Sequence, residues 1–259
     1  MVTAAKYVLP APPEPEIIYP DSDDEPMAEN TIQYRYIITI QPGLDSLFAD
    51  DPNVFVAADL FWYPVEGRPD IHYAPDTMVV FGRPKGDRGS YKQWEEDGIA
   101  PQVVFEIISP GNTWRKLVEK RSFYERYGVE EYYEYDPEQG VLGIWQRNEE
   151  RLQPTAHAGE WRSRRLGVTL KLEENGELSL YHPDGRKFLT PVEQEARARE
   201  AEAKAREAEA KTREAEAKAR EAEETAMQER TRADQTEQIN QRLLSKLREL
   251  GVDPATLGE

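Results

Sequence analysis

Glu106 is a carboxylate inside a run of apolar residues, VVFEII at 103–108. A strand that is apolar on both sides is normally buried on both faces of its sheet. A carboxylate there lowers stability by roughly several kcal/mol unless it is paired or binds a metal. Glu106 is therefore expected to ligate a metal ion, to pair with a buried arginine or lysine, or to cap backbone donors.

Asp76 is a second candidate, because it follows Pro75 and opens the next apolar run, TMVVF at 77–81. Alone it indicates a turn, since Pro-Asp is a common turn dipeptide. If the two runs are adjacent strands, however, Asp76 and Glu106 could bind one hard divalent cation, Mg²⁺ or Mn²⁺, through carboxylate oxygens. Such an ion polarises a phosphate and generates hydroxide.

Three basic residues are candidates for contact with a phosphate. Lys116 and Lys120 lie four residues apart in a predicted helix and so share a face. A lysine aimed at a scissile phosphate stabilises developing charge or orients the attacking water. The alternative is a solvated helix face, because lysine is mostly exposed. Arg88 lies in a polar, Gly-rich stretch at 82–101 that predicts a long loop.

The elements that would position these residues follow from the hydrophobic pattern. The runs at 103–109 and 131–136 predict strands, and the stretch at 113–127 between them predicts a helix that ends at Gly128. A helix between two apolar strands is a βαβ crossover, so the two strands are expected to be parallel.

The remaining elements complete an α/β or α+β pattern. Asn30 and Gln33 resemble a capping box, which predicts a helix that Pro42 would kink. Further strands are expected on both sides of the βαβ unit, within 52–67, 77–82, 141–147, 161–172 and 177–181.

The blocks APDTMVVFG, VVFEIISPG, the helix with its Glu-Lys pair, and YGVEEYYEYDP resemble the Uma-type family of restriction-endonuclease-like proteins in order and spacing. The resemblance covers about residues 30–190. It implies the PD-(D/E)XK nuclease fold, a mixed sheet flanked by helices. It also implies that the family's Asp and Glu fall on Asp76 and Glu106.

The resemblance includes one departure from the wider class. That class has lysine two residues after the glutamate, where this chain has Ile108. In the family the lysine lies on the next helix, where Lys120 matches it, and Tyr124 matches a family tyrosine one turn later. The implied activity is Mg²⁺- or Mn²⁺-dependent endonucleolytic cleavage of DNA. The alternative is an inactive nuclease fold that serves protein–protein interaction through the C-terminal tail.

The tail predicts a long charged helix. From Ala198 the chain repeats every seven residues, and the register continues into Leu243, Leu247 and Leu250. Heptads with charged flanking positions are typical of coiled coils, which would make a homo-oligomer or bind a partner protein. A single charged helix that acts as a spacer is the other interpretation.

Composition sets the remaining expectations. The formal net charge is −17, which argues against broad nonspecific DNA binding. There is no cysteine, which excludes disulfides and thiolate metal sites. The sequence shows neither a membrane span nor a signal peptide, so a cytoplasmic protein is expected. The predicted domains are a disordered acidic leader, the nuclease-like domain, the heptad helix and a flexible tail, at 1–29, 30–190, 191–250 and 251–259.

Overall fold

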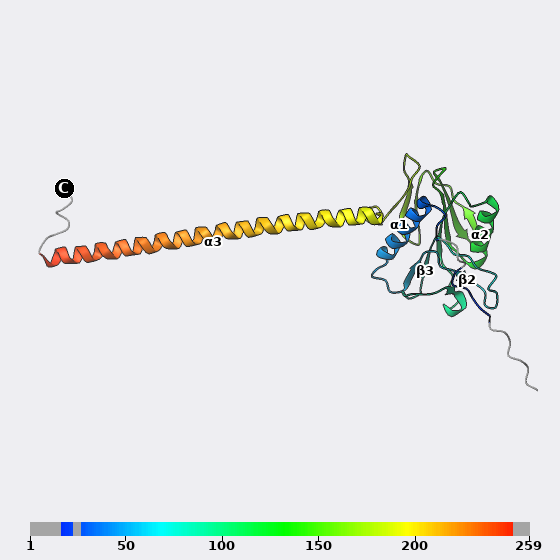
Figure 1. The fold of residues 1–259 in the computed structure, drawn as a ribbon, viewed down its shortest axis with the longest axis horizontal. Helices are drawn as coiled ribbons and strands as arrows, with labels where there is room; N and C mark the ends of the chain where they lie inside the picture. Colours follow the sequence, from blue (N-terminus) through cyan, green and yellow to red (C-terminus); the bar gives the residue numbers. More distant parts are fainter. Residues whose placement is uncertain (1–16, 23–26, 251–259) are drawn as a thin grey trace, which may run out of the picture. The chain divides into compact units, whose positions relative to one another are not determined.

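The computed structural model describes residues 17–22 and 27–250. The chain divides into two units, residues 1–194 and residues 195–259. The first unit holds the sheets with helices α1 (Thr31–Leu47) and α2 (Trp114–Tyr127), and the second holds most of α3 (Pro191–Glu249) (Figure 1). No helix of the described part of the chain combines the length and the apolar character that a bilayer span requires.

A six-stranded mixed sheet forms the centre of the first unit. Strands β5 and β6 pair in parallel through the α2 crossover, as predicted, and every other neighbouring pair in this sheet is antiparallel. The spatial order is β1-β3-β5-β6-β7-β8. Their bounds are β1 (Val54–Ala57), β3 (Thr77–Phe81), β5 (Val103–Ile107), β6 (Glu131–Asp136), β7 (Val141–Asn148) and β8 (Arg151–Pro154).

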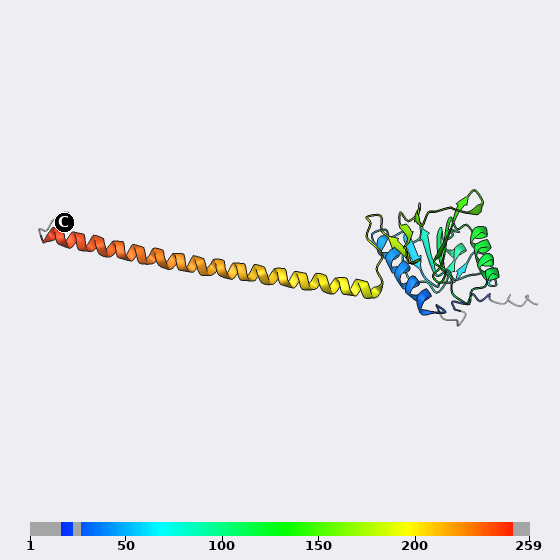
Figure 2. The same cartoon turned by 90° about the horizontal axis from the view of Figure 1, so that it is seen from above.

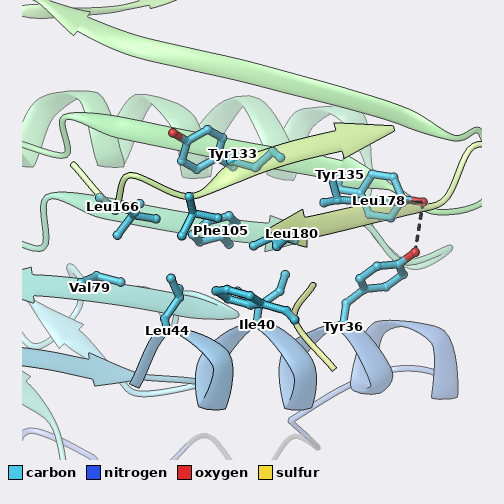
Figure 3. Packing of buried hydrophobic residues seen from close by; sticks show 14 of the residues in the cluster. Tyr36, Ile40, Leu44, Val79, Phe105, Tyr133, Tyr135, Leu166, Leu178 and Leu180 are labelled. Atoms are coloured by element: carbon cyan, nitrogen blue, oxygen red, sulfur yellow. Dashed lines mark hydrogen bonds between the residues drawn. The ribbon is translucent and has the colours of Figure 1, made fainter. Parts of the chain in front are cut away.

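Helix α1 covers one face of the sheet. Asn30 caps it, accepting hydrogen bonds from the Ile32 and Gln33 amides, and Pro42 lies inside it. Figure 3 shows Ile40 and Leu44 of α1 directed at the apolar side chains of the sheet, with the Tyr36 and Tyr135 hydroxyls joined by a hydrogen bond. The predicted helix is confirmed, and burial of its apolar side is what holds it in place.

Helix α2 covers the opposite face, and two views at right angles show the strands between the two helices (Figures 1 and 2). The Thr113 side chain caps α2 by accepting from the Lys116 amide at 3.3 Å. Gly128 ends it with φ of 104°, a left-handed conformation that glycine adopts without a steric penalty. Successive side chains of each strand therefore point alternately to the face that α1 covers and to the face that α2 covers.

Smaller elements surround the main sheet. The predicted loop at 82–101 contains the short strand β4 (Tyr91–Lys92) and the 3₁₀ helix η1 (Gln93–Glu95), and β4 pairs in parallel with β2 (Trp62–Tyr63). A second sheet, antiparallel throughout, follows β8. Its strands are β9 (Glu160–Arg162), β10 (Thr169–Leu172) and β11 (Leu178–Tyr181).

Part of the N-terminal segment packs on the first unit. The Tyr19 ring lies 5.3 Å from that of Tyr63 and 5.0 Å from that of Trp94, centroid to centroid. The Tyr63 hydroxyl donates a 2.6 Å hydrogen bond to the Pro20 carbonyl. The prediction of a disordered leader is therefore wrong for this part of the segment. Aromatic rings far along the chain make edge-to-face and tilted contacts with Tyr19 and hold it in place. The leader's residues 1–16 and 23–26, and the predicted flexible tail at 251–259, lie outside the described residues.

Helix α3 spans 59 residues, none of them buried. Its N-terminus is a capping box, in which the Glu193 carboxylate accepts from the amide and hydroxyl of Thr190, both at 2.8 Å. Along the repeat, pairs such as Glu200–Lys204 and Glu202–Arg206 form i,i+4 ion pairs. These local interactions favour the helix without any tertiary packing.

Candidate functional site

The sheet register brings the two predicted acids together. In the antiparallel pairing of β3 with β5, Thr77 lies opposite Phe105, so one further step places Asp76 opposite Glu106. Asp76 is 7% exposed and Glu106 is 4% exposed. Side chains alternate between the two faces of a strand, and this alternation directs both acids to the face that α2 covers. The two carboxylates therefore lie beneath that helix.

Two side chains of α2 bind the Glu106 carboxylate. The Lys120 ammonium donates a 2.7 Å hydrogen bond to Oε2, and the Tyr124 hydroxyl donates to Oε1. Lys120 and Tyr124 lie one helical turn apart, so they reach the strand from the same helix face. The structure thus brings together four of the predicted site residues, two acids from the sheet with a lysine and a tyrosine from the helix.

Asp76 is held by groups from two other elements. Its Oδ2 accepts a 2.6 Å hydrogen bond from the Ile107 amide on β5, and its Oδ1 accepts from Gln33 Nε2 at 3.2 Å. The Gln33 amide oxygen in turn accepts from the Glu29 amide at 2.9 Å. The sequence pattern assigned Gln33 only a capping role, and its contact with Asp76 across 43 positions has no local signal.

Burial, together with the nearby charge of Glu106, raises the pKa of Asp76 to about 7. Burial works to lower the pKa of Lys120, but the charges of Glu106 and Asp76 and the hydrogen bond to Glu106 outweigh it, so that pKa lies above its usual value. Burial and then the charge of Glu106 raise the pKa of Tyr124 well above its usual range. The lysine therefore carries its charge, and the tyrosine its proton, near neutral pH.

The loop after β5 is tied to Glu29, just before α1. Buried Ser109 donates from its hydroxyl to the Glu29 carboxylate, which also accepts a 3.1 Å hydrogen bond from the Gly111 amide. A side chain at position 111 would meet that carboxylate, so the Glu29 side chain would have to shift to keep its contacts with the loop. Glu29 is a further residue that the sequence pattern did not indicate, because its partners lie about 80 positions away.

Two predicted contacts lie away from this cluster. The Lys116 side chain is exposed in the first turn of α2. The Arg88 guanidinium binds the Glu96 carboxylate, with Nε 2.6 Å from Oε1, and lies 3.9 Å from the centroid of the Phe55 ring. For Arg88 the structure thus shows an ion pair and an aromatic partner where the sequence suggested an open loop.

The residues present fit a hard divalent cation. Among the described residues no group of three or more His, Cys, Asp or Glu side chains could hold a metal. Mg²⁺ is nevertheless commonly bound by one or two carboxylates, with water and substrate phosphate as the other ligands. Asp76 and Glu106 offer two such carboxylates in register. Burial, and then the charge of Glu106, raise the pKa of Asp76, and a cation bound between the two acids would favour the ionised form.

Comparison with known proteins places this arrangement in a family. The model of the Uma2 family, described as "Putative restriction endonuclease", matches residues 26–180, which is more than half of the chain and includes the four clustered residues. No curated protein matches the chain. A solved structure described as "a putative nuclease belonging to DUF820 from Anabaena variabilis ATCC 29413" is 15% identical, with a TM-score of 0.36 over 48% of this chain and 68% of the other. The chain belongs to the Uma2 family of restriction-endonuclease-like proteins.

Proposed function

We propose that this protein is a Mg²⁺- or Mn²⁺-dependent endonuclease that hydrolyses phosphodiester bonds of DNA. The observation that carries the proposal is the pair of buried carboxylates, Asp76 and Glu106, in register on adjacent strands with the Lys120 ammonium against one of them. Membership of a family described as "Putative restriction endonuclease" supports the reaction class and the DNA substrate. A DNA substrate also agrees with the expected cytoplasmic location.

Asp76 and Glu106 would hold the cation, which would polarise the phosphate and acidify a water molecule. The chain's own groups fix the geometry of the acids. The Ile107 amide and the Gln33 side chain orient the Asp76 carboxylate, while Tyr124 orients that of Glu106. Because these partners come from the sheet and from both helices, the acids are held rigidly before substrate arrives.

Lys120 would act on the phosphate. An ammonium group has three donors, and one of them binds Glu106 at 2.7 Å. Another can donate to a phosphate oxygen and stabilise the charge that develops there, or orient the attacking water. The lysine comes from α2. The position two residues after Glu106, where the wider class has its lysine, is occupied by Ile108, just past the end of β5.

One observation favours the second candidate, an inactive nuclease fold that serves protein–protein interaction through its C-terminal helix. Glu106 is already satisfied by Lys120 and Tyr124, so its ionised form needs no metal for stability. Under this candidate the acids and the lysine form a structural cluster. Metal would then neither bind nor stabilise the fold.

The deciding experiment measures cleavage of supercoiled plasmid by the full chain with Mg²⁺, Mn²⁺ or a chelator. Cleavage that requires metal and falls at least about 100-fold in Glu106→Gln is expected, because mutating groups that stabilise the transition state typically has effects of this size. Glu119→Gln is the matched control, since Glu119 lies on α2 in an exposed ion pair with Arg115. Cleavage that survives in Glu106→Gln would refute the assignment.

Thermal unfolding with metal separates the two candidates when no cleavage is seen. Metal at about 100 times its dissociation constant should stabilise the native state by about 2.7 kcal/mol. Asp76→Ala and Glu106→Ala should abolish that increase. A melting temperature that does not respond to metal would support the inactive scaffold.

A further inference from the structure

A second site lies on the α2 side of the sheet, at the carboxyl ends of β5 and β6. A cavity of about 550 Å³ opens there, within the size range of small-molecule sites. Among its lining residues are Ser109, Trp114, Leu117, Arg121, Glu134 and Trp145. None of the acids, lysine or tyrosine proposed for catalysis lines it, so the cavity is a separate feature beside the catalytic cluster.

Glu134 is the unusual residue of this cavity. It is 8% exposed, and its Oε2 accepts a 2.7 Å hydrogen bond from the Tyr132 hydroxyl. Among the described residues no donor binds the other oxygen, Oε1, and the Glu134 side chain lines the cavity. The charge of Arg121, another lining residue, acts on the same carboxylate.

Gly143 shapes the wall next to this carboxylate. In the pairing of β6 with β7 it lies opposite Glu134. A side chain at position 143 would collide with the six-membered part of the Trp145 indole and would displace that ring. The Arg121 guanidinium carbon lies over the indole, 4.8 Å from the ring centroid. The cavity thus offers a planar guanidinium, backed by an indole, beside an acceptor.

We propose that this cavity binds a guanine base of the nucleic-acid substrate, with the ring stacked on the Arg121 guanidinium that lies over Trp145. Its N1–H and N2–H₂ would donate to Glu134, one to Oε1 and the other to the remaining lone pair of Oε2. An ionised carboxylate only accepts hydrogen bonds. Guanine is the base whose Watson–Crick edge offers two adjacent donors, whereas adenine, cytosine and uracil place acceptors beside their single donor. The reading of this edge requires a single-stranded or flipped base.

The inference rests on the proposed function for the identity of its ligand. The parallel register of β5 with β6 places Glu134 next to Glu106, one strand spacing away, or about 4.8 Å. Because the cavity adjoins the catalytic cluster, a nucleotide bound there by its base can extend its phosphate toward Asp76 and Lys120. The cavity would then decide which nucleotide is presented for cleavage.

The test measures binding of GMP, AMP, CMP and UMP to the full chain with a chelator present, by calorimetry and quenching of tryptophan fluorescence. All four carry the same phosphate, so a difference reports on the base. GMP is expected to bind about 5- to 150-fold more tightly than the others, since a carboxylate–base pair discriminates by about 1–3 kcal/mol. Similar affinity for all four, or no binding, would overturn the inference.

Two variants locate the site. Glu134→Gln should remove the preference for GMP, and Gly143→Ala should weaken binding because the methyl group displaces the Trp145 ring. Glu119→Gln removes an exposed charge on α2 and should leave the preference intact. If Glu134→Gln fails to fold, the selectivity of the unmodified chain still decides.

Two other results have defined meanings. If trilysine competes with GMP and depends on Glu134 more strongly, the cavity serves a protein partner and the inference is wrong. Selective GMP binding without plasmid cleavage would support the base site while the proposed nuclease function fails. Metal-dependent cleavage by a chain that binds no nucleotide would leave the nuclease proposal standing and end this one.

Discussion

The same pair of side chains occurs in two very different settings. In the first unit, Lys120 lies 2.7 Å from Glu106, with the lysine side chain 21% exposed and the glutamate 5%. In α3, Lys204 lies 2.6 Å from Glu200, and these side chains are 73% and 67% exposed. The bond lengths are alike, so geometry alone does not distinguish the pairs.

Burial makes the difference. Water screens the exposed pair, which stabilises the helix by about 0.2–0.5 kcal/mol. The buried pair offsets the desolvation of Glu106, which lies opposite a second acid, Asp76. Loss of one partner is therefore minor in α3 and severe beneath α2. The contribution of an ion pair to stability therefore depends on the burial of its side chains and not on the length of its hydrogen bond.

The largest effect is expected for Lys120→Met. Removing the ammonium leaves the Glu106 charge buried beside Asp76, which should lower the free energy of unfolding by about 3–5 kcal/mol. Urea unfolding at pH 7 followed by tryptophan fluorescence measures it. Lys204→Met is the matched control and should change little. Equal effects of the two variants would contradict the comparison, and adding Glu106→Gln to Lys120→Met should restore part of the loss.

The next effect concerns the pH dependence of Asp76. Its native pKa of about 7 exceeds the ordinary aspartate pKa of 3.8, so the native state binds the proton more strongly than the unfolded chain does. The stability that this gives is complete below about pH 4 and is lost as pH rises through 7, by roughly 4 kcal/mol as an upper value. Asp76→Asn cannot titrate and should gain stability relative to the unmodified chain over this range.

Urea unfolding in the presence of a chelator, at several pH values between 4.5 and 8, measures that difference. The free energy of unfolding of the variant minus that of the unmodified chain is compared across pH, because the titration of other groups cancels in this difference. A difference that stays constant with pH would show that Asp76 is not shifted. Addition of Mg²⁺ at pH 8 should restore stability to the unmodified chain alone, because only it keeps both carboxylates.

A smaller effect is predicted for self-association through α3. If Leu243, Leu247 and Leu250 form the seam of a coiled coil, Leu247→Ala removes apolar burial worth about 1.5–3 kcal/mol. Light scattering after size-exclusion chromatography should then show a shift from oligomer toward single chains. Arg242→Ala, at an exposed neighbouring position, is the control. A single-chain mass for the unmodified protein at high concentration would instead favour the spacer interpretation.

The smallest effect is expected for Glu200→Gln. This change removes one exposed i,i+4 pair and should lower the stability of the helix by about 0.2–0.5 kcal/mol. Thermal melting of the helix, followed by circular dichroism at low salt, measures it, and high salt should abolish the difference. A loss above about 1 kcal/mol would mean that α3 is packed against a partner.

Features that depend on residues close together in the chain could be predicted from the sequence. The end of α2 at Gly128, the heptad helix with its i,i+4 pairs, and the isolated acid at position 106 were all visible in the local pattern. Hydrogen bonds within a helix join residues three or four positions apart, so spacing alone specifies them. The family resemblance added Asp76 and Lys120, which local pattern left ambiguous.

Only the tertiary structure decided which groups surround the acids. Gln33 reaches Asp76 across 43 positions, and Glu29 reaches Ser109 across 80. The ion pair of Arg88 with Glu96 and the cavity lined by Glu134 are likewise visible only in the folded chain. These contacts depend on sheet register and on the placement of helices across its two faces. A shift of one residue in a strand would turn every side chain to the other face. Strands β3 and β5 are buried on both faces, so their hydrophobic pattern does not fix that choice.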